Sequence, residues 1–412
     1  MRVLICGGGV AGLTLALCLE RQGHQPVIIE RAPNLRDEGY MISFCGAGYE
    51  ASERLGLLPV LERIHYPIPR LVFVDERGRE QVSLPYPLLR KRLFNDRHFN
   101  FMRGELVRAL MSQLEGKAEL RFSTTVEAIE QHEDHVRVRL TGGSMEDFDL
   151  LVGADGVHSR VRQLIFGPEE RFARSLGSYA AVFVMDNPPA ELFTPDAFLA
   201  LTLVNRGMAV YPVRGGRAAA LFIFRAERPV EDFSRESILR ELRAAFSGLG
   251  WIVPSLLEQA FQAGSLYFDK LMQIELPQWS AGRVILVGDA CQNLSLLAVQ
   301  GAAMGMAGAY VLAEELEAAR GEVNTAMARY EQRLKPVIKD QQAAARRAAA
   351  WSMPANAFRQ ALQEPELRMS LWPMVSAFIR RRMLGESVFA KEKPAGNASN
   401  HGMDLANRPA AP

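Results

Sequence analysis

The stretch that decides the fold is RVLICGGGVAGLTLALCLERQGHQPVIIE, residues 2–30. The apolar runs at 2–6 and 26–30 have the composition of strands that are buried on both faces of a parallel sheet. Residues 11–22 between them carry apolar side chains at helical spacing, and Gly23 stands where a helix C-terminal cap is expected. The stretch therefore predicts a β-α-β unit at the N-terminus.

The turn of this unit carries the pattern G-x-G-x-x-G, formed by Gly7, Gly9 and Gly12. The first glycine permits a tight turn, the second lets a pyrophosphate approach the backbone, and the third lets the helix pack on the strand. The helix N-terminus then points free amides at the phosphates. Glu30 follows Gly12 by 18 residues, near the spacing of about 20 at which an acid binds a ribose. The unit predicts a dinucleotide site, with a glycine turn in an unrelated α/β fold as the alternative.

Two further segments place acidic residues at the ends of predicted buried strands. Asp155 follows the strand at 149–153, where it can also be an ordinary helix cap. Asp289 follows the strand at 284–288 and can accept hydrogen bonds from sugar or polyol hydroxyls. The helix expected from about Gly301 would point its positive end into the same cleft and favour an anion there. A plain turn residue is the competing interpretation of Asp289.

Composition excludes several classes of protein. Lys+Arg 48 against Asp+Glu 47 gives a net charge of +1, so nothing indicates a nucleic-acid partner. The four cysteines, Cys6, Cys18, Cys45 and Cys291, are far apart, which favours the cytoplasm and argues against a metal site. No apolar run reaches the roughly 20 residues that a membrane-spanning helix needs, so no integral membrane segment is expected.

The order of the motifs resembles that of a known family. A glycine-rich turn is followed by GADG at 153–156 and by GDA at 288–290. This order is similar to that of the class A flavoprotein monooxygenases, the family of para-hydroxybenzoate hydroxylase, over about residues 1–345. The tetracycline-destructase-like branch looks closest, on the segments FMRGEL at 101–106, GW at 250–251, LYFD at 266–269 and GAYVLA at 308–313.

The resemblance implies an α/β fold in which a Rossmann-like FAD-binding domain is interleaved with an antiparallel β-sheet substrate domain. We expect the following division: a discontinuous FAD-binding domain at 1–70, 101–175 and 270–320; a substrate-binding sheet domain at 71–100 and 176–269; C-terminal helices at 321–390; and a disordered tail at 391–412. Within the helical region, Pro336 predicts a kink or a break.

The implied reaction is the hydroxylation of a phenolic or polycyclic aromatic molecule, with a tetracycline-like compound as a specific candidate. NADPH or NADH would reduce the FAD transiently, O2 would give a flavin hydroperoxide, and one oxygen would pass to the substrate. The resemblance implies cofactor contacts at Gly7, Gly9, Val10, Ala11, Gly12, Glu30, Arg31, Arg103, Asp155, Gly288, Asp289, Gln300, Gly301 and Ala302.

The reaction also needs an apolar substrate pocket, because water near the activated oxygen would waste it. Strand residues that could line this pocket are Phe183, Met185, Tyr211, Phe222 and Phe224, with core packing as the competing interpretation of each. No residue stands out as a general base.

The third motif departs from the family pattern at two places. Ser295-Leu296 stands where the family usually has a proline pair, and Val299 replaces the first glycine of a Gly-Gln-Gly loop. Either the loop is shifted or the pocket is drier and narrower. Three alternatives stay open. One is a flavin-dependent halogenase, of which Trp251-Ile252-Val253-Pro254 is a faint echo, and another is a non-catalytic FAD-binding protein. The third is a membrane-associated hydroxylase of a lipid-like quinone, suggested by the basic, amphipathic stretch from Leu371 to Leu384, for which a helix packed by its apolar side is the competing interpretation.

Overall fold

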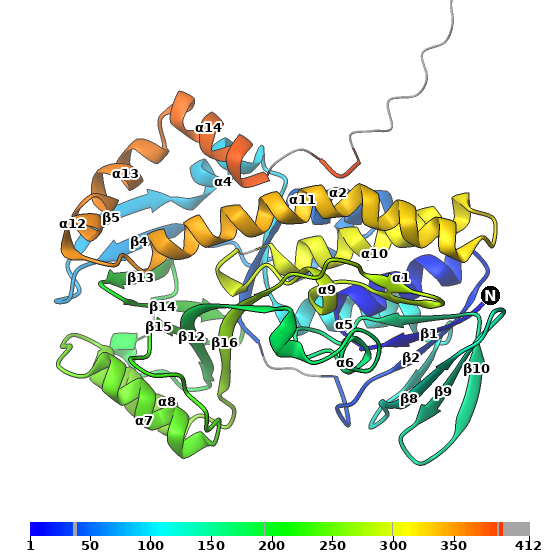
Figure 1. Cartoon of the computed structure of the whole chain (residues 1–412). Helices are drawn as coiled ribbons and strands as arrows, with labels where there is room; N and C mark the ends of the chain where they lie inside the picture. The colour runs from blue at the N-terminus through cyan, green and yellow to red at the C-terminus, as the bar shows by residue number, and fades with distance from the viewer. Residues whose placement is uncertain (36–38, 193, 299, 385–386, 390–412) are drawn as a thin grey trace, which may run out of the picture.

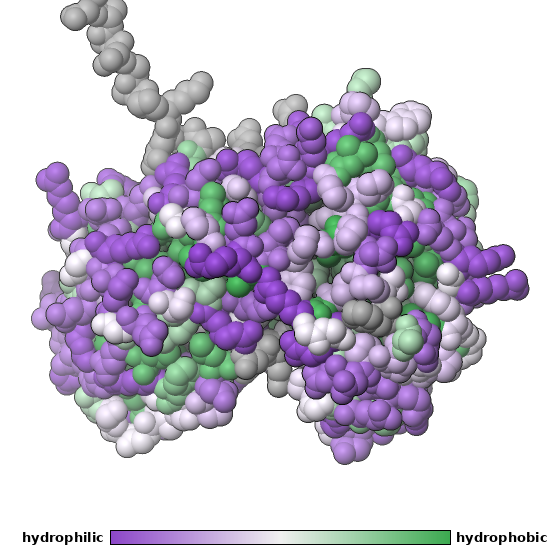
Figure 2. Space-filling view, turned by 180° about the vertical axis from the view of Figure 1, so that it is seen from behind, coloured by the Kyte–Doolittle hydropathy of each residue, from purple (hydrophilic) through white to green (hydrophobic). Residues whose placement is uncertain are grey.

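The computed structural model describes residues 1–35, 39–192, 194–298, 300–384 and 387–389. Two large sheets form two lobes, and the long helix α11 (Val323–Ser352) runs across both of them (Figure 1). From behind, the molecule is notched at its lower edge between the lobes (Figure 2). The tail expected at 391–412 and Val299 lie outside the described residues.

The first lobe is built on a six-stranded sheet in the order β17-β18-β11-β1-β2-β7. Its strands are β17 (Ser280–Ala281), β18 (Val284–Leu286), β11 (Leu150–Gly153), β1 (Arg2–Cys6), β2 (Gln25–Ile29) and β7 (Glu119–Arg121). All neighbours pair in parallel except β17 and β18. Helix α1 (Val10–Arg21) joins β1 to β2 and ends before Gly23, whose φ is +77°. The predicted β-α-β unit and its glycine cap are therefore confirmed.

The second lobe is built on a seven-stranded sheet in the order β16-β12-β15-β14-β13-β4-β5. Its strands are β16 (Tyr267–Ile274), β12 (Ala173–Met185), β15 (Arg217–Phe224), β14 (Arg206–Val213), β13 (Ala197–Leu203), β4 (Arg70–Val74) and β5 (Glu80–Pro85). The pairing is antiparallel except between β13 and β4. Strands β12 and β16 run past the boundaries expected at 176 and 269.

Both faces of this second sheet are buried. Helices α7 (Arg235–Phe246) and α8 (Val253–Gln262) cover one face, and the first lobe lies against the other (Figure 1). Because side chains alternate along a strand, Phe222 belongs to the hydrophobic cluster under α7, whereas Ile223 belongs to a cluster with Leu297 on the opposite face.

Smaller elements complete the structure. The remaining strands are β3 (Met41–Cys45) paired with β6 (His98–Met102), and β8 (Val126–Gln131), β9 (Val136–Leu140) and β10 (Met145–Phe148) in a three-stranded sheet. The remaining α-helices are α2 (Ala47–Arg54), α3 (Leu58–Ile64), α4 (Tyr86–Phe94), α5 (Arg103–Leu114), α6 (Arg160–Ile165), α9 (Asp289–Gln292), α10 (Gly301–Ala318), α12 (Ala357–Ala361), α13 (Gln363–Ser370) and α14 (Pro373–Leu384). Short 3-10 turns are η1 (Glu169–Arg171), η2 (Ala190–Leu192) and η3 (Leu296–Ala298).

Helix α11 continues through Pro336 without a break. Its buried face, which includes Tyr330, Leu334 and Ile338, packs on both sides of the proline and holds the helix together. In the ranges that the structure describes, no helix has both the length and the apolar character that crossing a bilayer demands.

Candidate flavin and substrate site

The three sequence motifs meet at one edge of the six-stranded sheet. Strands β1, β11 and β18 are adjacent and parallel, and the register aligns their last residues. The glycine turn, Ala154 and Gly288 therefore all follow at the carboxyl edge of the sheet. Ligands bind in the crevice outside this edge in open α/β sheets.

A cavity of about 400 Å³ lies in front of this edge, within the size range of small-molecule sites. Its first-lobe wall is formed by Gly9, Val10, Ala11, Arg103, Ala154, Gly156, Gly288, Asp289, Gly301, Ala302 and Gly305. Its apolar lining includes Phe198, Leu221 and Ile223 of the seven-stranded sheet, Ile68 and Leu71 near β4, and Leu296 and Leu297 of the turn before α10. One cavity thus joins a polar, glycine-rich side to a hydrophobic side.

The glycines of the first motif shape a cradle. A Cβ on Gly12 would lie 2.0 Å from the carbonyl oxygen of Gly7, and a Cβ on Gly7, whose φ is +115°, would lie 2.3 Å from that of Ala154. A Cβ on Gly9 would instead meet nothing within 4 Å. Two of the glycines therefore allow close packing, and the third leaves free space beside the N-terminus of α1, which fits a pyrophosphate.

Asp289 is the first residue of α9 and lines the cavity beside Arg103. Burial raises the pKa of its carboxyl, Arg103 lowers it, and Asp269 raises it further. No described residue donates a hydrogen bond to this carboxylate. A partly buried carboxylate is costly without donors, so the residue fits a ligand that carries hydroxyl groups.

Comparisons with known proteins agree with this geometry. A family model described as FAD binding domain matches residues 1–345. The chain belongs to the class A FAD-dependent monooxygenases. A flavin-dependent monooxygenase from an unknown prokaryotic organism is 31% identical over 350 residues, covering 83% of this chain and 87% of that protein.

Two solved structures extend the likeness to the whole fold. The tetracycline destructase Tet(55) has a TM-score of 0.79 and 26% identity, over 92% of this chain and 96% of that one. Klebsiella pneumoniae HpxO, complexed with FAD and uric acid, has a TM-score of 0.78 and 23% identity, over 93% of this chain and 97% of that one. The second likeness concerns the fold alone.

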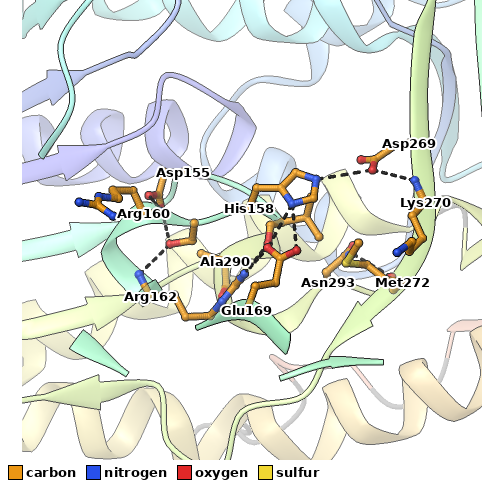
Figure 3. A network of polar contacts seen from close by, with 12 residues as sticks. Asp155, His158, Arg160, Arg162, Glu169, Asp269, Lys270, Met272, Ala290 and Asn293 are labelled. Carbon is orange, nitrogen blue, oxygen red and sulfur yellow. Dashed lines mark hydrogen bonds and ion pairs between the residues drawn. The ribbon is translucent and has the colours of Figure 1, made fainter. Parts of the chain in front are cut away.

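In this monooxygenase the second motif faces the cavity with its backbone. Ala154 and Gly156 line the cavity, whereas the carboxylate of Asp155 turns to the start of α6. It accepts hydrogen bonds from Ser159 Oγ at 2.5 Å and from the amide of Arg160 at 2.7 Å (Figure 3). Burial raises the pKa of Asp155, and these hydrogen bonds oppose the rise. These contacts are those of a helix cap, and a contact of Asp155 with the cofactor stays a prediction.

A network beside the second motif ties the lobes together (Figure 3). The buried guanidinium of Arg162 donates to the carbonyl oxygen of Ala290 at 2.9 Å and to Glu169 at 2.8 Å. His158 Nδ1 lies 3.1 Å from Glu169, and its Nε2 lies 3.5 Å from Asp269 of β16. Hydrogen bonds to Asp269 and Glu169 raise the pKa of His158 to about 10, so the imidazole carries its positive charge between two carboxylates at neutral pH.

Other predicted cofactor residues lie outside the cavity wall. The carboxylate of Glu30 accepts hydrogen bonds from the amides of Gly8 and Ala32, both at 2.9 Å, and Arg31 is exposed beside it. Gln300 is buried at the N-cap of α10. Contacts of these side chains with FAD stay predictions.

The residues predicted to line the substrate pocket are not part of the lining of this cavity. Phe183, Met185, Phe222 and Phe224 all lie in the hydrophobic cluster under α7, where Phe222 packs edge-on against Phe246 at 4.8 Å. Tyr211 stacks on Phe198 and accepts a hydrogen bond from the amide of Met41 at 3.1 Å. The cavity wall is made instead by Phe198 and by Leu221 and Ile223, which are the alternate residues of the same strand as Phe222 and Phe224.

The loop that replaces the family prolines has its own backbone conformation. Ser295 has a φ of +82°, which a proline ring cannot adopt, and its buried hydroxyl has no partner among the described residues. Ser295 and Leu296 both line the cavity.

The cavity lining also holds a polar group that was not predicted from the sequence, formed by Ser43, Tyr86 and Asn100. A signal was present, because Asn100 is a polar residue inside the apolar strand HFNFM, and a buried polar residue is more informative than an exposed apolar one.

Proposed function

We propose that this monooxygenase uses NADPH or NADH and O2 to hydroxylate a phenolic or polycyclic aromatic small molecule, with a tetracycline-like compound as a specific candidate. The observation that carries the proposal is the single cavity with a glycine-rich, charged wall on one side and an apolar wall on the other. The likeness to Tet(55) supports the tetracycline-like candidate. The four cysteines are all buried and free, which supports a reducing compartment such as the cytoplasm.

The residues of the first-lobe wall fit FAD. The cradle at Gly9 and the N-terminus of α1 would hold the pyrophosphate, and Asp289 would accept hydrogen bonds from hydroxyls of the cofactor chain. Arg103 would offset negative charge in the same wall. FAD, when bound, supplies the transfer of electrons from the nicotinamide and the activation of O2.

The residues of the second-lobe wall serve the substrate. Phe198, Leu221 and Ile223 present carbon surfaces toward the cofactor wall and exclude water from it. An aromatic substrate buried against them gains about 25 cal/mol for each Å² of apolar surface removed from water.

Purified protein tests the proposal directly. We expect a yellow protein with bound FAD, whose oxidation of NADPH or NADH is stimulated by members of a panel of phenols, hydroxynaphthalenes and tetracyclines. Each active compound should consume O2 and yield a product heavier by one oxygen atom. Dependence on chloride or bromide would favour the halogenase, and bound FAD without stimulated turnover would favour the non-catalytic protein. A folded protein that binds no FAD would refute the proposal.

A further inference from the structure

The polar group in the cavity wall is positioned by the two-stranded ribbon of β3 and β6. Ser43 pairs directly with Asn100, and Cys45 pairs with His98. Since side chains alternate along a strand, Ser43, His98 and Asn100 share one face of the ribbon. Ser43 and Asn100 line the cavity, whereas His98 is fully buried behind them and stacks on Phe94 at 4.5 Å.

His98 orients the hydroxyl of Ser43. Its Nε2 lies 2.5 Å from Ser43 Oγ, and its Nδ1 is buried without a partner among the described residues. Burial lowers the pKa of His98 to about 3, so the ring carries one proton. Buried N–H groups without an acceptor are rarer than unpaired acceptors, so we place this proton on Nε2. Nε2 then donates to Ser43 Oγ, which leaves the Ser43 hydrogen free for the cavity.

Tyr86 orients the amide of Asn100 in a similar way. The hydroxyl of Tyr86 donates to Asn100 Oδ1 at 3.1 Å, which assigns the NH2 group to the other side of the amide. Asn100 is 3% exposed, and its Nδ2 has no acceptor among the described residues. A buried donor of this kind is expensive to leave unpaired, and an acceptor oxygen of a ligand in the cavity that Asn100 lines would satisfy it.

We propose that Ser43 and Asn100 form a two-donor subsite that binds one acceptor oxygen of the substrate, namely a phenolate, enolate or carbonyl oxygen. This inference rests on the proposed function and specifies which part of the substrate the apolar cavity must orient. The two residues face each other across the ribbon, a geometry in which Cβ atoms lie about 5 Å apart and both donors can reach one oxygen.

The subsite lies near the first-lobe wall. Asn100 precedes Arg103 by three residues, and Met102 at the end of β6 is about 7 Å along the strand from Asn100. An aromatic ring held by its oxygen at Asn100 would therefore extend toward the wall that carries Arg103. Donors on a phenolate oxygen favour the charged form and keep the ring electron-rich.

Binding of 4-nitrophenol to the FAD-bound protein tests the inference, because its phenolate absorbs visible light and its neutral form does not. At a pH below the pKa of the free phenol, we expect wild-type protein to increase the phenolate band. Ser43→Ala and Asn100→Leu should each weaken phenolate binding about tenfold to a hundredfold, since a hydrogen bond to a charged group is lost. Asn100→Asp, which keeps the acceptor for Tyr86 and replaces the donor by an oxygen, should abolish the phenolate band.

Two controls make the result specific. Nitrobenzene lacks the phenolic oxygen of 4-nitrophenol, so wild-type and variant proteins should bind it alike. Ser112 is exposed, so Ser112→Ala should leave phenolate binding unchanged. His98 acts through Ser43 as a positioning residue, so His98→Leu should behave like Ser43→Ala, whereas His98→Gln, which keeps a donor, should restore binding.

The FAD content of every variant is measured first and separates the two proposals. Protein without FAD would refute the proposed function. FAD-bound variants that bind the phenolate as tightly as wild type, or wild type without a phenolate band, would overturn the two-donor subsite while leaving the proposed function standing.

Discussion

The two large sheets of this monooxygenase place functional residues by different rules. In the six-stranded sheet, three adjacent parallel strands end at one edge, and the turns after them form one wall of the cavity. In the seven-stranded sheet, the opposite wall comes from one face of the strands, and both faces are buried. In the six-stranded sheet, functional residues are found where the strands end. In the seven-stranded sheet, the alternation of side chains along a strand determines which residues face the cavity.

The largest effect should come from the glycines of the first sheet, compared with each other. In Gly12→Val the new side chain would overlap the carbonyl oxygen of Gly7, and we expect a loss of about 3 kcal/mol or more in the free energy of unfolding. In Gly9→Val the side chain enters open space at a φ of −85°, so the apoprotein should keep its stability within about 0.5 kcal/mol.

FAD binding completes this comparison. Both variants should lose the cofactor, Gly12→Val by misfolding and Gly9→Val by filling the cradle. Urea unfolding of the apoproteins and the flavin content after reconstitution measure the two effects separately. If Gly9→Val bound FAD normally, the cradle assignment would fail.

The second sheet allows a test on neighbouring residues of β15. Phe222→Ala removes a fully buried ring from the cluster under α7 and should cost about 3–5 kcal/mol of unfolding free energy. Ile223 faces the cavity, so Ile223→Ala should cost less, about 2 kcal/mol, while weakening the binding of an aromatic probe such as 2-naphthol. Denaturation of the apoproteins measures the unfolding free energy, and titration of the FAD-bound proteins with the probe measures its affinity. If both variants fold and only Phe222→Ala binds the probe more weakly, then Phe222 and not Ile223 faces the cavity.

This contrast explains what the sequence could predict. The glycine turn, Gly288 and Asp289 follow apolar runs whose parallel pairing brings their ends together, so the edge was predictable from order and spacing alone. In RAAALFIF, residues 217–224, every side chain from Ala218 to Phe224 except Leu221 is buried, and no polar residue marks the face that meets the cavity. Phe222 and Phe224 were predicted to line the pocket, but both rings pack against Phe246 of α7.

Single side chains were harder still. The sequence left Asp155 open as a cofactor residue or as a helix cap, and only the structure shows that its carboxylate accepts hydrogen bonds from the free amides at the start of α6. Asn100 and Ser43 meet across a ribbon of strands that are more than 50 residues apart in the sequence, and no local pattern encodes that pairing.

A moderate effect is expected for Asp289→Asn at the edge of the first sheet. The amide replaces a carboxylate that accepts hydrogen bonds from FAD hydroxyls, so the dissociation constant for FAD should rise about tenfold to a hundredfold. The apoprotein should be as stable as wild type or more stable, because burial of an unpaired charge is relieved. Fluorescence titration of FAD measures the affinity, with the exposed Asp186→Asn as the control. Unchanged affinity in Asp289→Asn would contradict the role of the carboxylate.

The smallest effect concerns His158, which joins the two sheets between Glu169 and Asp269. The pKa of its imidazole rises from 6.5 to about 10 on folding, because hydrogen bonds to Asp269 and Glu169 favour the charged form. The stability that it contributes is therefore fully present below about pH 6.5 and is lost as the pH rises through about 10. Since the side chain is 53% exposed, solvent screening limits the contribution to about 1 kcal/mol. Urea unfolding of wild type and His158→Gln should show a difference at pH 6 that shrinks toward pH 10. A difference that grows with pH would mean that the neutral imidazole, and not the cation, joins the two lobes.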